Sequence, residues 1–232
     1  MRDAANRLDL SERLETWAGD DHLRKDVATT VAVIARGCAE IAALVAAGPL
    51  AGALGASRGA DNGGGDEQKE LDVRCDDILR EACKGAPVAA LASEEADHAV
   101  ALDPEGTMLV AVDPLDGSSN IDTDVSVGTI FSIRPCPEGG DPSSDAAFLR
   151  AGSEQLAAGY VVYGPHCALV LTVGDGVDLY VLDPERRRFI LVRERLAVPE
   201  EAREFAINMS NYRHWDDRVR AYVDDMIAGR DG

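Results

Sequence analysis

Basic residues are scarce in this chain. Its 232 residues include 23 lysines and arginines against 42 aspartates and glutamates, which gives a formal net charge of −19. Nucleic-acid binding proteins need clustered basic side chains to contact phosphates, so the composition argues against that class of function. The same deficit sets a condition on any anionic substrate, because metal ions or local basic groups must then offset the repulsion.

The sequence also lacks a convincing membrane span or export signal. Its apolar stretch from Ile41 to Ser57 is short and is interrupted by Gly48-Pro49, which indicates a helix followed by a turn. The first 20 residues are polar and charged, unlike a signal peptide. We therefore expect a cytoplasmic protein with no membrane partner.

Several common site motifs are missing as well. The five cysteines form no C-x-x-C pair, and the four histidines show no zinc spacing such as H-E-x-x-H. Reduced thiols are the expectation for the cysteines. Neither a Walker motif nor G-x-G-x-x-G is present, so nucleotide binding of those kinds is not indicated.

The hydrophobic pattern, in a chain that is 46% hydrophobic, predicts a domain with both helices and strands. Apolar residues at helical spacing predict helices over 23–45 and 73–83, with a Gly-rich loop over 55–65 between them and a last helix over 215–226. Short apolar or alternating runs predict strands over 88–91, 107–112, 127–133, 157–163, 168–173, 177–182, 189–192 and 204–207. The closely spaced later strands predict an antiparallel meander.

One stretch carries the clearest chemistry. An apolar run, Met108–Val112, leads into Asp113-Pro114-Leu115-Asp116-Gly117-Ser118-Ser119-Asn120-Ile121-Asp122. We expect a turn at Pro114 that points Asp113 and Asp116 into one site, with the Leu115 carbonyl between them as a further oxygen ligand. Gly117, Ser118 and Ser119 offer backbone N–H groups and hydroxyls to an anion.

Other carboxylates are expected to join this pair. Glu94 and Glu95 follow the strand predicted over 88–91, and Asp66 and Asp72 lie further upstream. If the two strands are neighbours, their ends bring four carboxylates together, and divalent cations are needed to neutralise them. Taken singly, each group also suits an ordinary turn or a solvated surface; it is the combination that favours a metal and phosphate site.

The motif resembles the signature of the class I fructose-1,6-bisphosphatases. The likeness extends to Lys69–Val73, Ser93–Glu95, Ser126–Phe131, Ala157–Tyr160 and Phe189–Val192, and so to nearly the whole chain. The shorter D-P-L-D-G-S pattern is shared with inositol monophosphatases. The resemblance implies an α+β sugar-phosphatase, or inositol monophosphatase-like, fold: a mixed, largely antiparallel sheet flanked by helices.

The resemblance also implies roles for individual residues. Mg²⁺, about two or three ions per site with Mn²⁺ or Zn²⁺ as substitutes, is bound by Glu94, Asp113, Asp116 and the Leu115 carbonyl. Glu95 and Asp66 orient or deprotonate the attacking water, and Asp72 supports the closed state of a loop. The sugar bisphosphate is held by Asp116, Gly117, Ser118 and Ser119 at its 1-phosphate and by Asn208 at its 6-phosphate.

The implied reaction hydrolyses fructose 1,6-bisphosphate to fructose 6-phosphate and phosphate, in gluconeogenesis or the Calvin cycle, by a cytoplasmic homotetramer. The chain as a whole, 1–232, corresponds to the family's N-terminal domain, and the C-terminal α/β domain of the family is expected to be absent. The alternatives are a sedoheptulose-1,7-bisphosphatase, an inositol-phosphatase-like enzyme, and a truncated inactive domain that binds only metal or phosphate. Thr107-Met108 replace the Lys-Tyr pair of AMP-inhibited members, which argues against that inhibition, and the lone Cys136 argues against the plastid disulfide switch.

Overall fold

The structure is a computed structural model, and it describes residues 8–48, 57–61, 67–202 and 204–229. The chain divides into two units, Met1–Leu196 and Ala197–Gly232.

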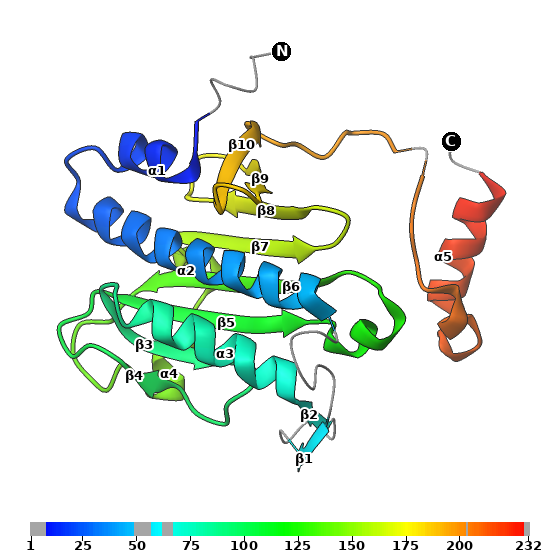
Figure 1. Cartoon of the computed structure of the whole chain (residues 1–232). Helices are drawn as coiled ribbons and strands as arrows, with labels where there is room; N and C mark the ends of the chain where they lie inside the picture. Colours follow the sequence, from blue (N-terminus) through cyan, green and yellow to red (C-terminus); the bar gives the residue numbers. More distant parts are fainter. Residues whose placement is uncertain (1–7, 49–56, 62–66, 203, 230–232) are drawn as a thin grey trace. The chain divides into compact units, whose positions relative to one another are not determined.

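The first unit is built on one sheet, drawn in Figure 1. Within the described residues it has eight strands in the spatial order β10-β9-β8-β7-β6-β5-β3-β4. Its strands are β3 (Val88–Ser93), β4 (Val100–Ala101), β5 (Met108–Asp116), β6 (Val127–Pro135), β7 (Ala157–Tyr163), β8 (Cys167–Thr172), β9 (Asp178–Asp183) and β10 (Arg188–Arg193). The pair β3–β5 is parallel, and the other neighbours in this described sheet are antiparallel. The predicted meander and the mixed, largely antiparallel sheet are confirmed.

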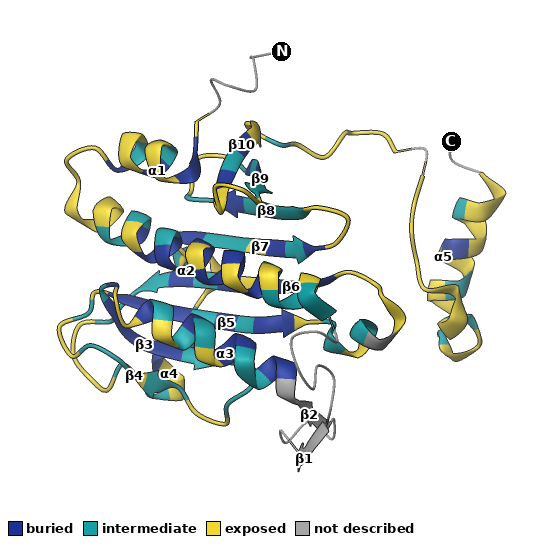
Figure 2. Cartoon of the chain, in the orientation of Figure 1, coloured by how far each residue is buried: buried dark blue, intermediate teal, exposed yellow. Residues whose placement is uncertain are grey.

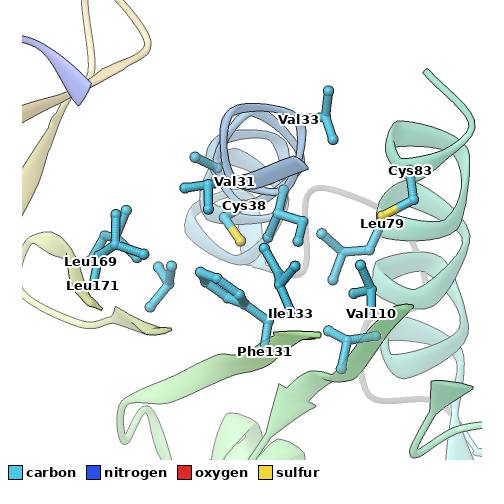
Figure 3. Close-up of a cluster of buried hydrophobic side chains, with 14 of the residues drawn as sticks. Val31, Val33, Cys38, Leu79, Cys83, Val110, Phe131, Ile133, Leu169 and Leu171 are labelled. Carbon is cyan, nitrogen blue, oxygen red and sulfur yellow. The ribbon is translucent and has the colours of Figure 1, made fainter. Parts of the chain in front are cut away.

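Three helices cover one face of this sheet: α1 (Leu10–Ala18), α2 (His22–Ala47) and α3 (Glu70–Cys83). The alternating burial of β6 shows why they pack there, because Val127, Thr129, Phe131 and Ile133 are buried while the residues between them are not. Figure 3 shows Cys38 and Val31 of α2 above Phe131 and Ile133 of the sheet, with Leu79 of α3 nearby. The main core therefore lies between the sheet and this helical layer.

The ends of these helices follow local sequence signals. Asp9 caps α1, since its side chain accepts from the Glu12 N–H and the Glu12 side chain accepts from the Asp9 N–H. Helix α1 was not predicted from the sequence, although this D-x-x-E capping box indicates a helix start. The N–H of Arg24 donates to the Asp21 side chain at the start of α2.

Helix α2 has a length and hydropathy that would suit a membrane span. Half of that apolar stretch is buried inside the protein. Gly37 lies so close to α3 that an added Cβ would come within 2.9 Å of Leu79 Cδ2. The apolar composition of α2 is thus used in packing against the sheet and α3.

Several predicted elements differ from the structure. Strand β5 continues through Asp116 instead of turning at Pro114. Ser57–Asp61, predicted as part of a Gly-rich loop, forms β1 and pairs with β2 (Glu67–Lys69), while 55–56 and 62–65 of that loop lie outside the described residues. The loop after β6 contains a short helix, α4 (Asp145–Phe148), whose Ala147 packs with Ala90 and Leu109.

In the second unit the strand predicted over 204–207 is wrong. Residues 204–207 form no regular structure and are exposed, and no strand in the described part of this unit pairs with them. A 3-10 helix, Met209–His214, and helix α5 (Asp217–Ala228) follow, which confirms the final helix. Asp216 caps α5 by accepting from the N–H groups of Arg218 and Val219, and Val223 is buried.

All five cysteines lie in the described residues and are free thiols, with Cys38, Cys75 and Cys83 buried between the helices and the sheet. Burial raises the pKa of the Cys38 thiol to about 11 and that of the Cys83 thiol to about 12. These thiols therefore remain protonated at neutral pH.

Gly159 offers a test of the packing on the helical face. A Cβ at this position of β7 would lie 2.7 Å from Phe131 Cζ and 2.8 Å from the Val170 carbonyl oxygen, whereas a Cβ on Gly152 would meet nothing within 4 Å. Gly159→Ala should lower the free energy of unfolding by about 1–3 kcal/mol through overpacking. The matched Gly152→Ala should change it by less than about 0.5 kcal/mol. Urea titration measures both; equal stabilities of the two variants would contradict this account.

Candidate active site

The central acidic motif lies on a bulge in β5. Asp113 pairs with Ile130 and Asp116 pairs with Gly128, so three steps along β5 match two along β6. The ladder thus holds one extra residue, and bulges of this kind redirect side chains and are common beside active sites. The predicted turn at Pro114 is replaced by this irregularity inside the strand.

Asp113 lies at the centre of the acidic cluster. It is half-buried, and its Oδ1 accepts a hydrogen bond of 3.1 Å from the Leu115 N–H. Burial raises the pKa of Asp113 to about 6, and the charges of Asp116, Glu94 and, less strongly, Asp72 add to the increase. The carboxylates predicted to converge therefore do affect one another.

The parallel pair β3–β5 explains why Glu94 joins this group. Ser93 is the partner of Val112, and the Glu94 N–H donates to the Val112 carbonyl at 3.0 Å. Glu94, the first residue after β3, consequently lies beside Asp113, the residue that follows Val112 in β5. The prediction that the two strands are neighbours is confirmed.

Two further predicted residues approach from α3 and the β3 end. Asp72 is buried in the first turn of α3 with 4% of its surface exposed, and the Glu95 N–H donates to Ser93 Oγ at 3.3 Å. Asp72 and Glu95 both act on the same neighbour, since their charges add to the burial that raises the pKa of the Cys75 thiol. The two carboxylates thus lie near the helix–sheet junction beside the acidic edge.

The predicted phosphate cradle follows β5 directly. Gly117 has a φ of 78° and precedes a 3-10 helix, Ser118–Thr123. This left-handed backbone favours glycine, and a Cβ there would also lie 3.2 Å from Asn120 Nδ2. The Asn120 N–H donates to the Gly117 carbonyl at 2.8 Å, while Ser118 is half-buried and Ser119 is exposed. The chain therefore turns sharply at this point and presents small, polar groups.

The donor set suits a hard divalent cation, because it consists of carboxylate and carbonyl oxygens. The raised pKa of Asp113 supports this fit, since a cation would stabilise the charged carboxylate that burial and the neighbouring charges disfavour. Among the described residues, however, no three His, Cys, Asp or Glu side chains come close enough to hold one metal ion together. The acidic groups share one region but do not form a closed ligand cage.

Two predicted residues cannot be placed in this region. Asp66 lies outside the described residues. Asn208 belongs to the second unit, where its Oδ1 accepts from the Ser210 N–H at 3.1 Å and from the Ser210 hydroxyl at 2.6 Å. Within its own unit, Asn208 caps the 3-10 helix Met209–His214.

One neighbour of the acidic edge was not assigned a role from the sequence. Thr129, on β6, is fully buried, and its hydroxyl donates to the Pro114 carbonyl at 2.8 Å. A threonine among the apolar inward positions Val127, Phe131 and Ile133 was the available signal, because a buried hydroxyl needs a partner.

The helix-flanked, mixed sheet has the sugar-phosphatase architecture. Comparisons with known proteins identify the family within this architecture. The family model described as "Fructose-1-6-bisphosphatase, N-terminal domain" matches residues 12–194. The chain is 54% identical over 229 residues to a class 1 fructose-1,6-bisphosphatase of Xanthobacter autotrophicus. It is 50% identical over 228 residues to one of Azorhizobium caulinodans. The chain therefore belongs to the fructose-1,6-bisphosphatase family, for which dependence on a divalent metal is general.

A solved structure agrees with this assignment. The holo form of Leishmania major fructose-1,6-bisphosphatase matches with a TM-score of 0.86 at 30% identity, covering 95% of this chain and 68% of that one. The matches to the two bacterial relatives cover 99% and 98% of this chain, and 61% and 70% of the relatives. The chain thus spans roughly two thirds of the length of these relatives.

Asp113→Asn tests the electrostatics of the acidic edge. The folded-state pKa of about 6 lies above the ordinary 3.8, so ionising Asp113 opposes folding, and this cost develops as pH rises from about 4 to above 6. Asn keeps an acceptor for the Leu115 N–H but carries no charge. Without metal, the variant should be more stable than the wild type at pH 8 by about 1 kcal/mol, a value reduced for solvent screening because Asp113 is half-exposed.

The gain should disappear near pH 4, and thermal unfolding in EDTA at both pH values measures it. The control is Asp20→Asn, because Asp20 is fully exposed in the turn between α1 and α2. Its Oδ1 lies 4.0 Å from Lys25 Nζ. A destabilised Asp113→Asn at pH 8 would contradict the account in which burial and the neighbouring charges make the ionised carboxylate unfavourable.

Proposed function

We propose that this chain carries the metal- and phosphate-binding half of a magnesium-dependent fructose-1,6-bisphosphatase. The reaction is hydrolysis of the 1-phosphate of fructose 1,6-bisphosphate to give fructose 6-phosphate and phosphate. The observation that carries this proposal is the grouping of Glu94, Asp113, Asp116 and Asp72 at the bulged edge of β5, in a chain of this family.

The metal-binding role is assigned to Glu94, Asp113, Asp116 and the Leu115 carbonyl. The support is that Glu94 directly follows β3 beside Asp113 of the neighbouring parallel strand β5, and that Asp113 and Asp116 stand at the two ends of the bulge. Mg²⁺ bound by them would neutralise phosphate oxygens and stabilise the charge of the transferring phosphoryl group. Mn²⁺ and Zn²⁺ are substitutes of similar charge.

The remaining residues divide between water activation and substrate binding. Glu95 and Asp66 are proposed to orient the attacking water and accept its proton, and Asp72 to support loop closure. Gly117, Ser118 and Ser119 are proposed to hold the 1-phosphate with N–H and hydroxyl donors, assisted by Asp116 as a ligand of the shared metal. Asn208 is proposed to donate to the 6-phosphate.

We also propose a cytoplasmic protein that serves gluconeogenesis or the Calvin cycle and assembles as a homotetramer. Sedoheptulose 1,7-bisphosphate is an alternative substrate of the same chemistry, and an inositol phosphate is a less similar one. A second candidate function is metal and phosphate binding without turnover by this chain alone. The observation that favours it is that the chain spans 61% of the Xanthobacter relative.

Phosphate release separates these candidates. The chain should release phosphate from fructose 1,6-bisphosphate in the presence of Mg²⁺ and lose this activity in EDTA. Sedoheptulose 1,7-bisphosphate and inositol monophosphate are assayed beside it. Asp113→Asn should lose at least about 100-fold in rate, because it removes a charged metal ligand, while Asp20→Asn should match the wild type.

Calorimetric titration with Mg²⁺ completes the design. Binding of Mg²⁺ without release of phosphate from any substrate would favour the binding-only candidate. Neither Mg²⁺ binding nor turnover, in a folded chain, would contradict both candidates. Preferential turnover of inositol monophosphate would contradict the bisphosphatase assignment.

A further inference from the structure

A chain of buried hydroxyl groups connects the acidic edge to the core. Thr129 Oγ1 donates to the Pro114 carbonyl at 2.8 Å and lies 2.7 Å from the hydroxyl of Tyr163 on β7. Thr129 and Tyr163 are 0% and 5% exposed. Such groups are rarely buried without a complete set of partners, so their arrangement constrains the backbone that they contact.

The direction of these hydrogen bonds follows from counting protons. The Pro114 carbonyl can only accept, so the single hydroxyl proton of Thr129 is directed to it. In the hydrogen bond between the two side chains, the Tyr163 hydroxyl must then donate to Thr129 Oγ1. Cys38 of α2 lies at the far end, close enough that both hydroxyls lower its pKa against the larger effect of burial. These groups therefore form a continuous series from α2 through Tyr163 of β7 and Thr129 of β6 to Pro114 of β5.

The position of Thr129 explains its choice of partner. It lies on β6 between Gly128 and Ile130, which are the partners of Asp116 and Asp113. It therefore faces the bulge, where the regular ladder between the two strands is interrupted. Its side chain provides a hydrogen bond to the bulged residue Pro114 at the place where the shift in register disturbs the backbone pairing.

We propose that Thr129 and Tyr163 are positioning residues, which hold Asp113 and Asp116 in a metal-binding geometry by fixing the Pro114 carbonyl between them. The inference rests on the proposed function for the identity of the cation, but the anchoring itself is a property of the metal-free chain. Neither residue contacts the metal or substrate in this proposal; each acts through the backbone of β5. Partners of this kind commonly change metal affinity 10- to 100-fold.

The first measurement is amide hydrogen exchange in EDTA. The Leu115 N–H, which donates to Asp113 Oδ1 inside the bulge, reports its rigidity, and the Val110 amide in the same strand serves as the internal reference. Thr129→Val should raise the exchange of Leu115 relative to Val110 about tenfold, because it removes the hydrogen bond to the Pro114 carbonyl. Tyr163→Phe should raise the same ratio by a smaller factor, because Thr129 keeps that bond but loses the donor that orients its hydroxyl.

The second measurement is Mg²⁺ affinity by calorimetry. Thr129→Val should weaken Mg²⁺ binding at least tenfold, while Thr129→Ser, which keeps the hydroxyl, should bind as the wild type does. The matched control is Thr30→Val: Thr30 is also 0% exposed and its hydroxyl donates to a backbone carbonyl, that of Asp26, at 2.8 Å. This control should change stability but neither the exchange ratio nor the Mg²⁺ affinity.

An unchanged exchange ratio in Thr129→Val, or an unchanged Mg²⁺ affinity beside a wild type that binds Mg²⁺, would overturn the inference. If Thr129→Val does not fold, Tyr163→Phe decides the question, since it removes one oxygen and keeps the ring. A wild type that binds no Mg²⁺ would contradict the proposed function instead, and the exchange ratio would still decide whether the bulge is anchored in this way.

Discussion

One extra residue in β5 governs the geometry of the acidic edge. Because three steps from Asp113 to Asp116 match two steps on β6, the side chains on this segment cannot follow the regular alternation of a strand. The bulge begins directly after the pairing of β5 with the parallel strand β3 ends at Val112, so the end of β3 brings Glu94 beside it. The rest of the sheet acts as a frame that keeps these two strands adjacent.

The acidic groups are held together against their mutual repulsion. Asp113 shows the cost directly, since its pKa rises to about 6 through burial and the charges around it. A folded chain tolerates such a cluster when packing elsewhere supplies the stability and when charge of opposite sign offsets it during function. Here the packing comes from the layer formed by α1, α2 and α3 on the buried face of the sheet.

Periodicity predicted most of the fold, because the long helices and the meander each bury one regular face. α2, α3, β3 and the strands from β6 to β10 follow from it closely. The bulge could not be predicted in this way: Pro114 reads as a turn locally, and only the pairing with β6 keeps the segment in the sheet. The strand expected over 204–207 failed for the opposite reason, because an apolar alternation forms no strand without a partner.

The residues of the candidate site also differ in whether a local sequence pattern predicts them. The grouping of Glu94, Asp113 and Asp116 could be predicted because they follow apolar runs, and the ends of neighbouring strands meet at a sheet edge. Thr129 was missed because its role depends on the register between β5 and β6, which no local pattern encodes. Asp66 and Asn208 remain predictions from the family resemblance.

The buried thiols can report how often the helical layer separates from the sheet. Cys38 belongs to α2, Cys75 and Cys83 belong to α3, and all three are buried. Thiol reagents attack the thiolate, a form that burial suppresses in all three. Their alkylation therefore requires the helical layer to separate from the sheet. The rate at which these cysteines become modified would measure how often that separation occurs, without any introduced probe.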